Sequence, residues 1–297
     1  MTTPLPSQIT PIDHAGHACL RINTCHGTAI LALFGAHLLS WVPTGQRDVL
    51  WVSPNALPEP AAIRGGVPVC WPWFAKQGVP TSARQHGVVR NVTWAVDAIH
   101  HSTDESVSLT LSPVLTGLDL AELSAAAPGM KTSMTLTVSD VLTQTLHTWN
   151  GGTTPFTLSQ ALHSYFAVGD ALQTGIEGLT GLPYDDRLRN LARDVQQTPF
   201  VLIDACDRTY QQTDGQPQHS YTLVDPVWQR RIQIDTTGSQ SVVVWNPGHE
   251  RSCTVVDLPD DGWHGFFCVE TTNAGPDVVL LAPGAEHRLT HTLRVTS

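Results

Sequence analysis

The sequence contains no long apolar run and no N-terminal leader pattern. No stretch approaches the ~20 apolar residues that a membrane-spanning helix needs. The chain starts with MTTPLPSQITP, which has neither the basic region nor the apolar region of a secretory signal peptide. We therefore expect a soluble cytoplasmic protein with no membrane partner.

Cysteine motifs are also missing. The six cysteines are scattered, form no Cys-x-x-Cys pair, and mostly stand among apolar residues. In a cytoplasmic protein such cysteines stay reduced and pack as small apolar side chains. The sequence thus predicts free thiols rather than disulfides at Cys19, Cys25, Cys70, Cys206, Cys253 and Cys268.

Positive charge is scarce in this chain. Its 297 residues include 16 Lys and Arg against 26 Asp and Glu, which gives a formal net charge of −10. A field of this sign repels nucleic acid, so we expect no nucleic-acid partner. It also means that an anionic ligand must be captured by a few local cations.

The chain has fourteen histidines but no recognisable metal-binding pattern. Two close pairs occur, HAGH at 14–17 and HRLTH at 287–291, and neither has the HExxH arrangement. The second pair lies in a segment that alternates like a strand, where residues i and i+4 are ~13 Å apart. That distance is too long for two ligands of one ion. We predict no metal site and no cofactor.

Helical periodicity is rare, whereas strand alternation is common. The best helical candidate is the segment 117–129, which fits a helical turn or a loop. Apolar and polar residues alternate, between turn-forming segments, at 106–112, 133–139, 230–235, 241–246 and 264–272. The pattern predicts an all-β, mainly antiparallel fold, a large β-sandwich with few short helices.

No linker and no internal repeat divides the chain. Pro and Gly are spread along it as turn residues, and 297 residues suffice for one large core. We expect residues 1–27 to lead into the first strands and residues 28–297 to form a single domain. We take the protein to be a monomer.

A histidine lies in the alternating segment TPFTLSQALHSYFAV at 154–168. Strict alternation places small and polar residues on one face, namely Thr157, Ser159, Ala161, His163, Tyr165 and Ala167. The other face, with Leu158, Leu162 and Phe166, has the character of core. His163 with Tyr165 would suit the floor of a ligand site. The alternative is a structural histidine bonded to a neighbouring strand.

Two polar segments supply candidate cations. IRGGVPVCWPWFAKQGVP at 63–80 predicts an irregular loop, because its three prolines cannot donate to a sheet. Arg64 beside two glycines suits an anion or sugar contact, or else ties the loop to a carboxylate. Lys76 is a third possible cation. ARQHGVVRNVTW at 83–94 adds Arg90, and two arginines give the bidentate contacts that a phosphate needs.

Two acidic residues stand in strand-like segments. FFCVETTNA at 266–274 places Glu270 on the same face as Phe266 and Cys268. A carboxylate in an apolar strand is costly unless it is solvated, paired or functional. Asp207 in DACDRTY at 204–210 is either functional or a local ion-pair partner of Arg208.

Taken in chain order, these motifs resemble one family. RGGVPVCWPWF, QHG followed by RN, ALHSYFAVGD, DRTY, VVWNPG and FFCVET are similar to the glucose-6-phosphate 1-epimerases, within the aldose 1-epimerase superfamily. The resemblance runs from about residue 28 to the C-terminus. It implies a galactose-mutarotase-like β-sandwich that binds its sugar in a concave, solvent-open groove.

The resemblance also implies roles for matching residues. His163 and Glu270 match the catalytic pair, and Arg64 and Arg90 match contacts to the substrate phosphate. Hydroxyl or other substrate contacts fall to Gln85, Asp207 and His86. The implied reaction interconverts α and β anomers of hexose 6-phosphates by acid–base ring opening and closure, without a cofactor.

Two other functions remain open at the level of the sequence. One is an aldose 1-epimerase acting on unphosphorylated sugars, which would not call for two converging arginines. The other is a non-catalytic carbohydrate-binding or sugar-phosphate-binding module on the same sandwich. It would bind a sugar without speeding the exchange of its anomers.

Overall fold

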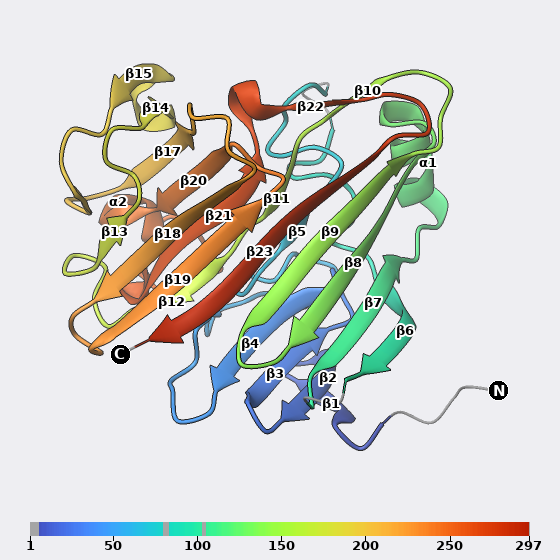
Figure 1. Cartoon of the computed structure of the whole chain (residues 1–297), viewed down its shortest axis with the longest axis horizontal. Helices are drawn as coiled ribbons and strands as arrows, with labels where there is room; N and C mark the ends of the chain where they lie inside the picture. Colours follow the sequence, from blue (N-terminus) through green and yellow to red (C-terminus); the bar gives the residue numbers. More distant parts are fainter. Residues whose placement is uncertain (1–5, 80–82, 103–104, 297) are drawn as a thin grey trace.

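Two large antiparallel β-sheets pack face to face in the computed structural model, which describes residues 6–79, 83–102 and 105–296 (Figure 1). Apolar side chains from both sheets form one large core cluster between them. The outer surface of one sheet faces solvent, whereas loops cover the outer surface of the other.

The solvent-facing sheet has nine strands. Their order across the sheet is β16 (Phe200–Val201), β13 (Gly175–Glu177), β18 (Gln218–Asp225), β19 (Arg230–Thr237), β23 (Glu286–Thr296), β9 (Leu142–Asn150), β8 (Met130–Val138), β7 (Val107–Pro113) and β6 (Trp94–His101).

The second large sheet has eight strands. Seven follow one another as β15 (Ala192–Val195), β14 (Pro183–Asp186), β17 (Cys206–Gln211), β20 (Ser241–Asn246), β21 (Phe266–Asn273), β11 (Gln160–Leu162) and β5 (Val69–Cys70). The eighth, β12 (Tyr165–Ala167), also pairs with β21.

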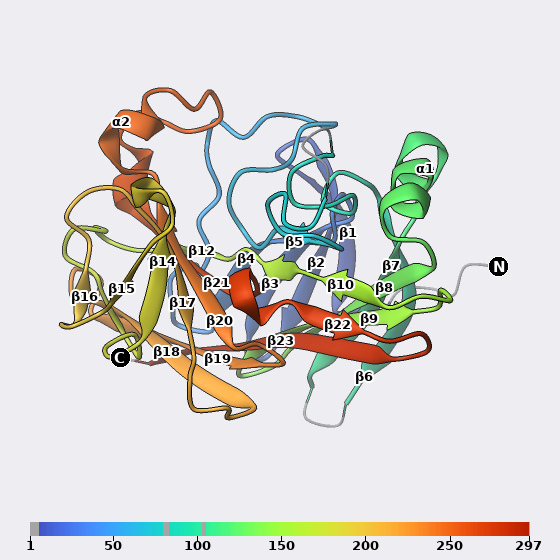
Figure 2. The same cartoon turned by 90° about the horizontal axis from the view of Figure 1, so that it is seen from above.

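Smaller elements complete the fold. A four-stranded sheet contains β1 (Ile9–His14), β2 (His17–Thr24), β3 (Gly27–Ala32) and β4 (His37–Pro43), and a two-stranded sheet pairs β10 (Phe156–Leu158) with β22 (Val279–Leu281). The helices are α1 (Gly117–Ala126), α2 (Gly248–Ser252), η1 (Arg187–Arg189), η2 (Gly262–Gly265) and η3 (Gly275–Asp277). Figure 2 shows α1, α2 and the long loops on the side away from the nine-stranded sheet.

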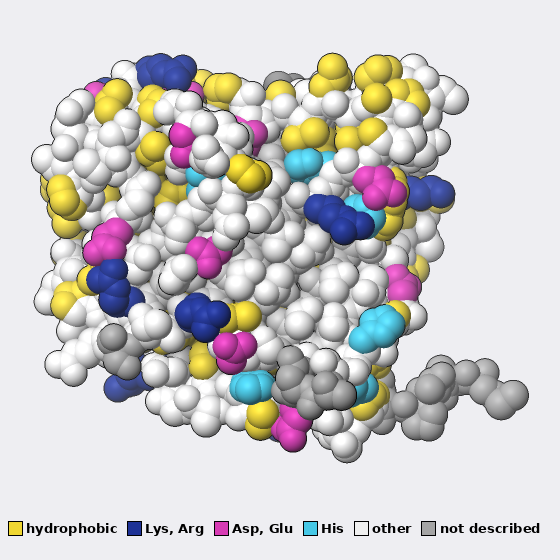
Figure 3. All heavy atoms as spheres, viewed as in Figure 1, with side chains coloured by type: hydrophobic (Ala, Val, Ile, Leu, Met, Phe, Trp, Pro, Cys, Tyr) yellow, Lys and Arg dark blue, Asp and Glu magenta, His cyan; other side chains and the backbone are white. Residues whose placement is uncertain are grey.

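Alternation in the sequence produces the nine-stranded sheet. Along β8 and β9, buried and half-buried residues alternate without interruption. The inward residues join the core, and outward threonines hydrogen-bond across the strands, as in Thr145 with Thr290 at 2.9 Å. Figure 3 views this outer face, where most side chains are uncharged and charged ones are scattered.

The predicted all-β, mainly antiparallel sandwich is confirmed, and so are its short helices. Of the two readings left open for 117–129, the helix is correct, since α1 covers Gly117–Ala126. Asp119 lies in its first turn, where the helix dipole favours negative charge. Pro128 and Gly129 follow its end, as is common after a helix.

The single strand expected around His163 is divided into three. The predicted alternation holds, because Leu158, Leu162 and Phe166 enter the main core. The continuity was wrong: β10, β11 and β12 are separate, and β10 belongs to a different sheet. At the break, the His163 main-chain amide donates to the Pro68 carbonyl at 3.0 Å. The break thus ties this segment to the loop before β5.

The two faces of β21 have different roles. Phe267 and Val269 point into the core between the large sheets. Phe266 and Cys268 belong to a separate cluster on the opposite face, which also carries Glu270. That face lies under the loops and forms the floor of a cavity.

The helices of the described residues are all short. None of them is long and apolar enough to cross a membrane.

Candidate active site

A cavity of about 360 Å³ lies on the loop-covered face of the eight-stranded sheet. Its lining is rich in charged and aromatic side chains. The residues that line it are Ala61, Ala62, Arg64, Phe74, Gln85, His86, Arg90, Asn91, His163, Tyr165, Arg187, Asp207, Val243, Trp245, Arg251, Asp257 and Glu270. All seven residues predicted from the sequence to form the site are among them.

Strand register builds the cavity floor. Direct cross-strand pairing aligns one row of residues over four adjacent strands: Asp207, Trp245, Cys268 and Tyr165. In the next row, Val243 of β20 stands opposite Glu270 of β21. Because residues directly opposite share a face, the acidic and aromatic groups all project to the same side.

Two glycine-containing loops form the wall. Gly66 has φ +60°, and a Cβ there would lie 2.3 Å from the Leu38 carbonyl oxygen. Gly87, directly after His86, has φ +80°, and a Cβ there would lie 1.9 Å from the Trp71 carbonyl oxygen. Only glycine fits such left-handed, crowded positions. These close approaches hold the loops that carry Arg64 and His86 against the sheet.

His163 and Glu270 meet at the bottom of the cavity. Nε2 of His163 lies 3.4 Å from Oε1 of Glu270, and both residues are buried. Nδ1 of His163 and Oε2 of Glu270 have no hydrogen-bond partner among the described residues. The pair therefore holds two buried polar atoms without a protein partner, in side chains that line the cavity.

Burial shifts both pKa values toward the neutral forms. It raises the pKa of Glu270 well above its usual range, and the nearby carboxylate of Asp207 adds to this. It lowers the pKa of His163 well below its usual range, with His86 and Arg90 adding to the effect. A histidine in water titrates near neutrality. Desolvation moves His163 away from that range, because it disfavours the imidazolium ion.

His86 is held as a neutral hydrogen-bonding group. Its Nδ1 accepts the main-chain amide of Ala75 at 3.2 Å, which places its proton on Nε2. The side-chain amide of Gln85 lies 3.0 Å from Nε2, and to accept that proton it must turn its oxygen rather than its nitrogen toward the ring. Burial, with Arg90 and Arg187 nearby, lowers its pKa to about 3. His86 therefore contributes a hydrogen bond rather than charge to the cavity.

Arg64 is anchored on two sides. Its Nε donates to Oδ2 of Asp257 at 3.1 Å and its Nη1 to the Tyr165 hydroxyl at 3.0 Å. The reading in which Arg64 ties its loop to a carboxylate is thus part of the answer. Its Nη2 makes no hydrogen bond to the described residues and remains available to a ligand.

Arg90 is less restrained than Arg64. Its Nε is buried without a hydrogen-bond partner, and its guanidinium forms no ion pair within the described ranges. Cys70, His86, His163 and Glu270 all experience its positive charge. Arg90 thus brings an uncommitted cation into the cavity, close enough to act on His163 and Glu270.

Two further arginines line the cavity and were not foreseen. Arg187 of η1 lies 3.9 Å from Asp207 and 5.6 Å from the centre of the Phe74 ring. Arg251 of α2 also acts on Asp207 electrostatically. Both stand in loop-side segments with no alternation and no motif, so the sequence held no signal for them.

Asp207 differs from one of its two expected readings. The local ion pair with Arg208 is not formed, because neighbouring strand residues point to opposite faces. Arg208 pairs instead with Asp186 at 3.2 Å. Burial raises the pKa of Asp207, while Arg187 and Arg251 oppose the shift.

One group of side chains has the composition of a metal-ion site. A donor atom from each of His163, Cys268 and Glu270 lies within 4.8 Å of the other two. Alternation placed Cys268 on the face of Glu270, but only the sheet register brings it beside Tyr165. Two of the three side chains, His163 and Glu270, are the acid–base pair itself. Lys76, the third cation considered, lines a neighbouring cavity instead.

Comparison with known proteins agrees with this geometry. A family model described as aldose 1-epimerase matches residues 19–294. A protein named "Putative glucose-6-phosphate 1-epimerase" from Escherichia coli is 36% identical over 253 residues, which covers 83% of this chain and 80% of that protein. A protein of the same name from Cenchrus ciliaris is 27% identical over 274 residues, or 90% of this chain and 80% of that one.

A solved structure matches along the whole chain. The "putative mutarotase" from Salmonella typhimurium superposes with a TM-score of 0.87 and 28% sequence identity, covering 100% of this chain and 96% of that one.

Proposed function

The chain belongs to the aldose 1-epimerase family, and on this premise we propose that it interconverts the α and β anomers of hexose 6-phosphates, with glucose 6-phosphate as the substrate to test first. It is an isomerase of the epimerase class. The observation that carries the choice of a phosphorylated substrate is the cavity itself, where the His163–Glu270 contact and four arginine guanidiniums line one space.

Anomer exchange needs one base and one acid. A base removes the proton of the C1 hydroxyl while an acid protonates the ring oxygen, so the C1–O5 bond breaks and an open-chain aldehyde forms. Rotation about C1–C2 presents the other carbonyl face, and closure returns both protons. We assign Glu270 as the base and His163 as the acid in the opening step. Each positioned group typically contributes ~10²–10⁴-fold to the rate.

A single shared proton is enough for Glu270 to act as the base and His163 as the acid. Burial favours a protonated Glu270 beside a neutral His163 in the empty cavity. Moving that proton across the 3.4 Å contact gives the carboxylate and the imidazolium that the opening step uses. The neutral pair and the ion pair hold the same number of protons, so no proton from solvent is needed.

The remaining polar residues would hold the sugar. Arg64 through Nη2 and Arg90 through its unpaired guanidinium would bind the phosphate, since charge-assisted bonds to an anion are the strong ones. Asp207, Gln85 and His86 would bind sugar hydroxyls.

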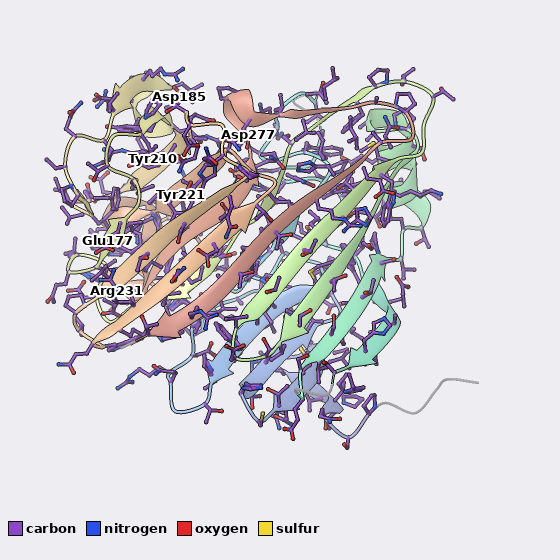
Figure 4. All side chains as sticks on the ribbon, viewed as in Figure 1. Glu177, Asp185, Tyr210, Tyr221, Arg231 and Asp277 are labelled. Atoms are coloured by element: carbon purple, nitrogen blue, oxygen red, sulfur yellow. The ribbon has the colours of Figure 1, made fainter. Side chains whose placement is uncertain are left out.

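Anomer-exchange NMR on glucose 6-phosphate tests the proposal. Glu270→Gln removes the base and should slow enzymatic exchange by at least ~10²-fold. Arg90→Ala should chiefly raise KM for the phosphorylated sugar. Glu177→Gln and Arg231→Ala are matched controls, because these two residues pair with each other on the outer sheet, far from the cavity (Figure 4).

Two outcomes favour the alternatives. Equal rates with glucose and glucose 6-phosphate would indicate an epimerase for unphosphorylated sugars. Binding of glucose 6-phosphate with exchange that does not depend on Glu270 would indicate a sugar-phosphate-binding module.

Two finer expectations stay proposals. We propose a cytoplasmic location, with which the buried thiols of Cys19, Cys70, Cys206 and Cys268 agree, and a monomeric state. Sedimentation velocity of the full chain measures the latter.

A further inference from the structure

Tyr165 contacts both functional ends of the cavity, although neither proton transfer nor phosphate binding has been assigned to it. Its ring stacks on the imidazole of His163, with centroids 5.1 Å apart and planes 9° from parallel. Its hydroxyl accepts the hydrogen bond from Nη1 of Arg64 at 3.0 Å. One side chain therefore joins the acid of the reaction to a proposed phosphate ligand.

The Tyr165 hydroxyl determines how Arg64 lies. A guanidinium is planar, so two fixed hydrogen bonds on different nitrogens define its plane and the direction of the third nitrogen. Asp257 fixes Nε and Tyr165 fixes Nη1, and these anchors come from different parts of the fold. The direction of Nη2, on a side chain that lines the cavity, follows from both. With the Asp257 contact alone, the group can rotate about it.

Tyr165 is itself a rigid support. Its main-chain amide donates to the Gly66 carbonyl at 2.8 Å, and its carbonyl accepts the Trp51 amide at 2.9 Å. Its ring packs against Phe266, 5.2 Å away between centroids. Only 1% of Tyr165 is exposed. Because Tyr165 is fixed by these contacts, its hydroxyl determines the orientation of the Arg64 guanidinium, and not the reverse.

We propose that the Tyr165 hydroxyl is a specificity-determining positioning group: it aims Arg64 at the 6-phosphate and thereby sets the preference for phosphorylated over unphosphorylated hexoses. This inference rests on the proposed function. It assigns no proton transfer to Tyr165. By holding the phosphate on Arg64, it places the sugar so that the ring oxygen meets His163.

Tyr165→Phe isolates the hydroxyl, because the aromatic ring and its stacking on His163 stay. The substitution removes a hydrogen bond to a charged group. With glucose 6-phosphate we therefore expect KM to rise ~10-fold or more, while kcat falls by less than about threefold. With free glucose, kcat/KM changes by less than about threefold. Tyr221→Phe is the matched control, since it also removes a hydrogen-bonded buried hydroxyl, but from the other sheet (Figure 4).

A double-variant cycle shows whether the hydroxyl acts through Arg64. In an Arg64→Ala background, Tyr165→Phe should leave KM for glucose 6-phosphate within about twofold, because the group that it orients is gone. A similar rise of KM in both backgrounds would overturn the proposal. So would an unchanged KM in Tyr165→Phe alone, or an equal loss with glucose and glucose 6-phosphate.

Calorimetric titration with inorganic phosphate separates this inference from the proposed function. If wild-type protein fails to exchange glucose 6-phosphate anomers, the proposed function falls. The positioning role still predicts that Tyr165→Phe weakens phosphate binding by ~10-fold. Equal phosphate affinity in wild type and variant would overturn the positioning role in either case.

Discussion

Three buried polar atoms in the cavity lack hydrogen-bond partners among the described residues. They belong to the side chains of His163, Glu270 and Arg90. Leaving such an atom unsatisfied costs ~1–3 kcal/mol, and folded proteins mostly avoid it. All three side chains line the same cavity. Hydroxyl and phosphate oxygens of a sugar phosphate are the kinds of atoms that would satisfy them.

The pH dependence of kcat/KM should reflect the one-proton state of the catalytic pair. Below the lower pKa both groups are protonated and no base exists; above the upper pKa both are deprotonated and no acid exists. Burial moves the first pKa down and the second up. The acid limb should thus have its midpoint below ~6.5, the usual histidine pKa.

Free glucose is the better substrate for this measurement, since a phosphate monoester has its own pKa near ~6. The profile of kcat/KM reports the free enzyme, which is the state described here. An acid limb with its midpoint at pH ~6.5 or above would contradict the expected lowering of the His163 pKa.

At the scale of single residues, alternation was the reliable signal. It placed Glu270 on the face of Cys268 and away from Val269, as observed. It could not find Arg187, Arg251 or Asp257, because their positions depend on how loops fold over the sheet. Nor could it give the pKa of His163, which follows from burial by elements distant in the sequence.

At the scale of elements, the site depends on a broken strand and two crowded loops. The break between β11 and β12 lets His163 leave the sheet and bond Pro68, while Tyr165 rejoins β21. A periodic pattern does not reveal such a break, since the side-chain faces are the same before and after it. The polar loop motifs did indicate the wall, because Pro restricts backbone geometry locally and Gly allows conformations that other residues avoid.

Gly87→Ala should destabilise the protein more than Gly45→Ala does. The two glycines have nearly equal φ, +80° and +78°, so the backbone strain is matched. Only at Gly87 does the added Cβ meet main chain, at 1.9 Å from the Trp71 carbonyl oxygen; nothing lies within 4 Å at Gly45. We expect a loss of ~1 kcal/mol for Gly45→Ala and ~3 kcal/mol for Gly87→Ala.

Denaturant unfolding monitored by fluorescence gives both free energies of unfolding. Gly87→Ala should also raise KM, because Gly87 follows His86 directly. Equal destabilisation by the two substitutions would show that the loop yields without cost and that the close approach does not hold the wall.

At the scale of the whole molecule, one continuous core joins the sheets. The cluster contains Ile22 and Leu31 of the N-terminal sheet together with Leu146 and Leu293 of the nine-stranded sheet. β2 of the segment 1–27 pairs along its length with β3. We therefore propose a single cooperative unit that includes residues 9–43.

Differential scanning calorimetry should show one unfolding transition, with the calorimetric enthalpy close to the van't Hoff enthalpy. Because the N-terminal sheet shares the core, it has no separate apolar layer with which to melt on its own. A second calorimetric transition at lower temperature, in which Trp41 of the N-terminal sheet becomes exposed, would contradict this.

The whole chain has a formal net charge of −10, whereas its cavity gathers Arg64, Arg90, Arg187 and Arg251. Two of these arginines are balanced by Asp257 and Asp207. Such a distribution agrees with local capture of an anion by a molecule whose overall field repels it.

The cavity floor depends on the strand register that aligns Asp207, Trp245, Cys268 and Tyr165, and therefore on the lengths of these strands. Inserting a single residue early in β21 would turn Glu270 into the apolar layer and place an adjacent, non-catalytic side chain in the cavity. Evolution can lengthen or shorten the surrounding loops with far less harm. Differences among homologous enzymes should therefore accumulate as loop insertions and deletions, while the lengths of these central strands stay constant.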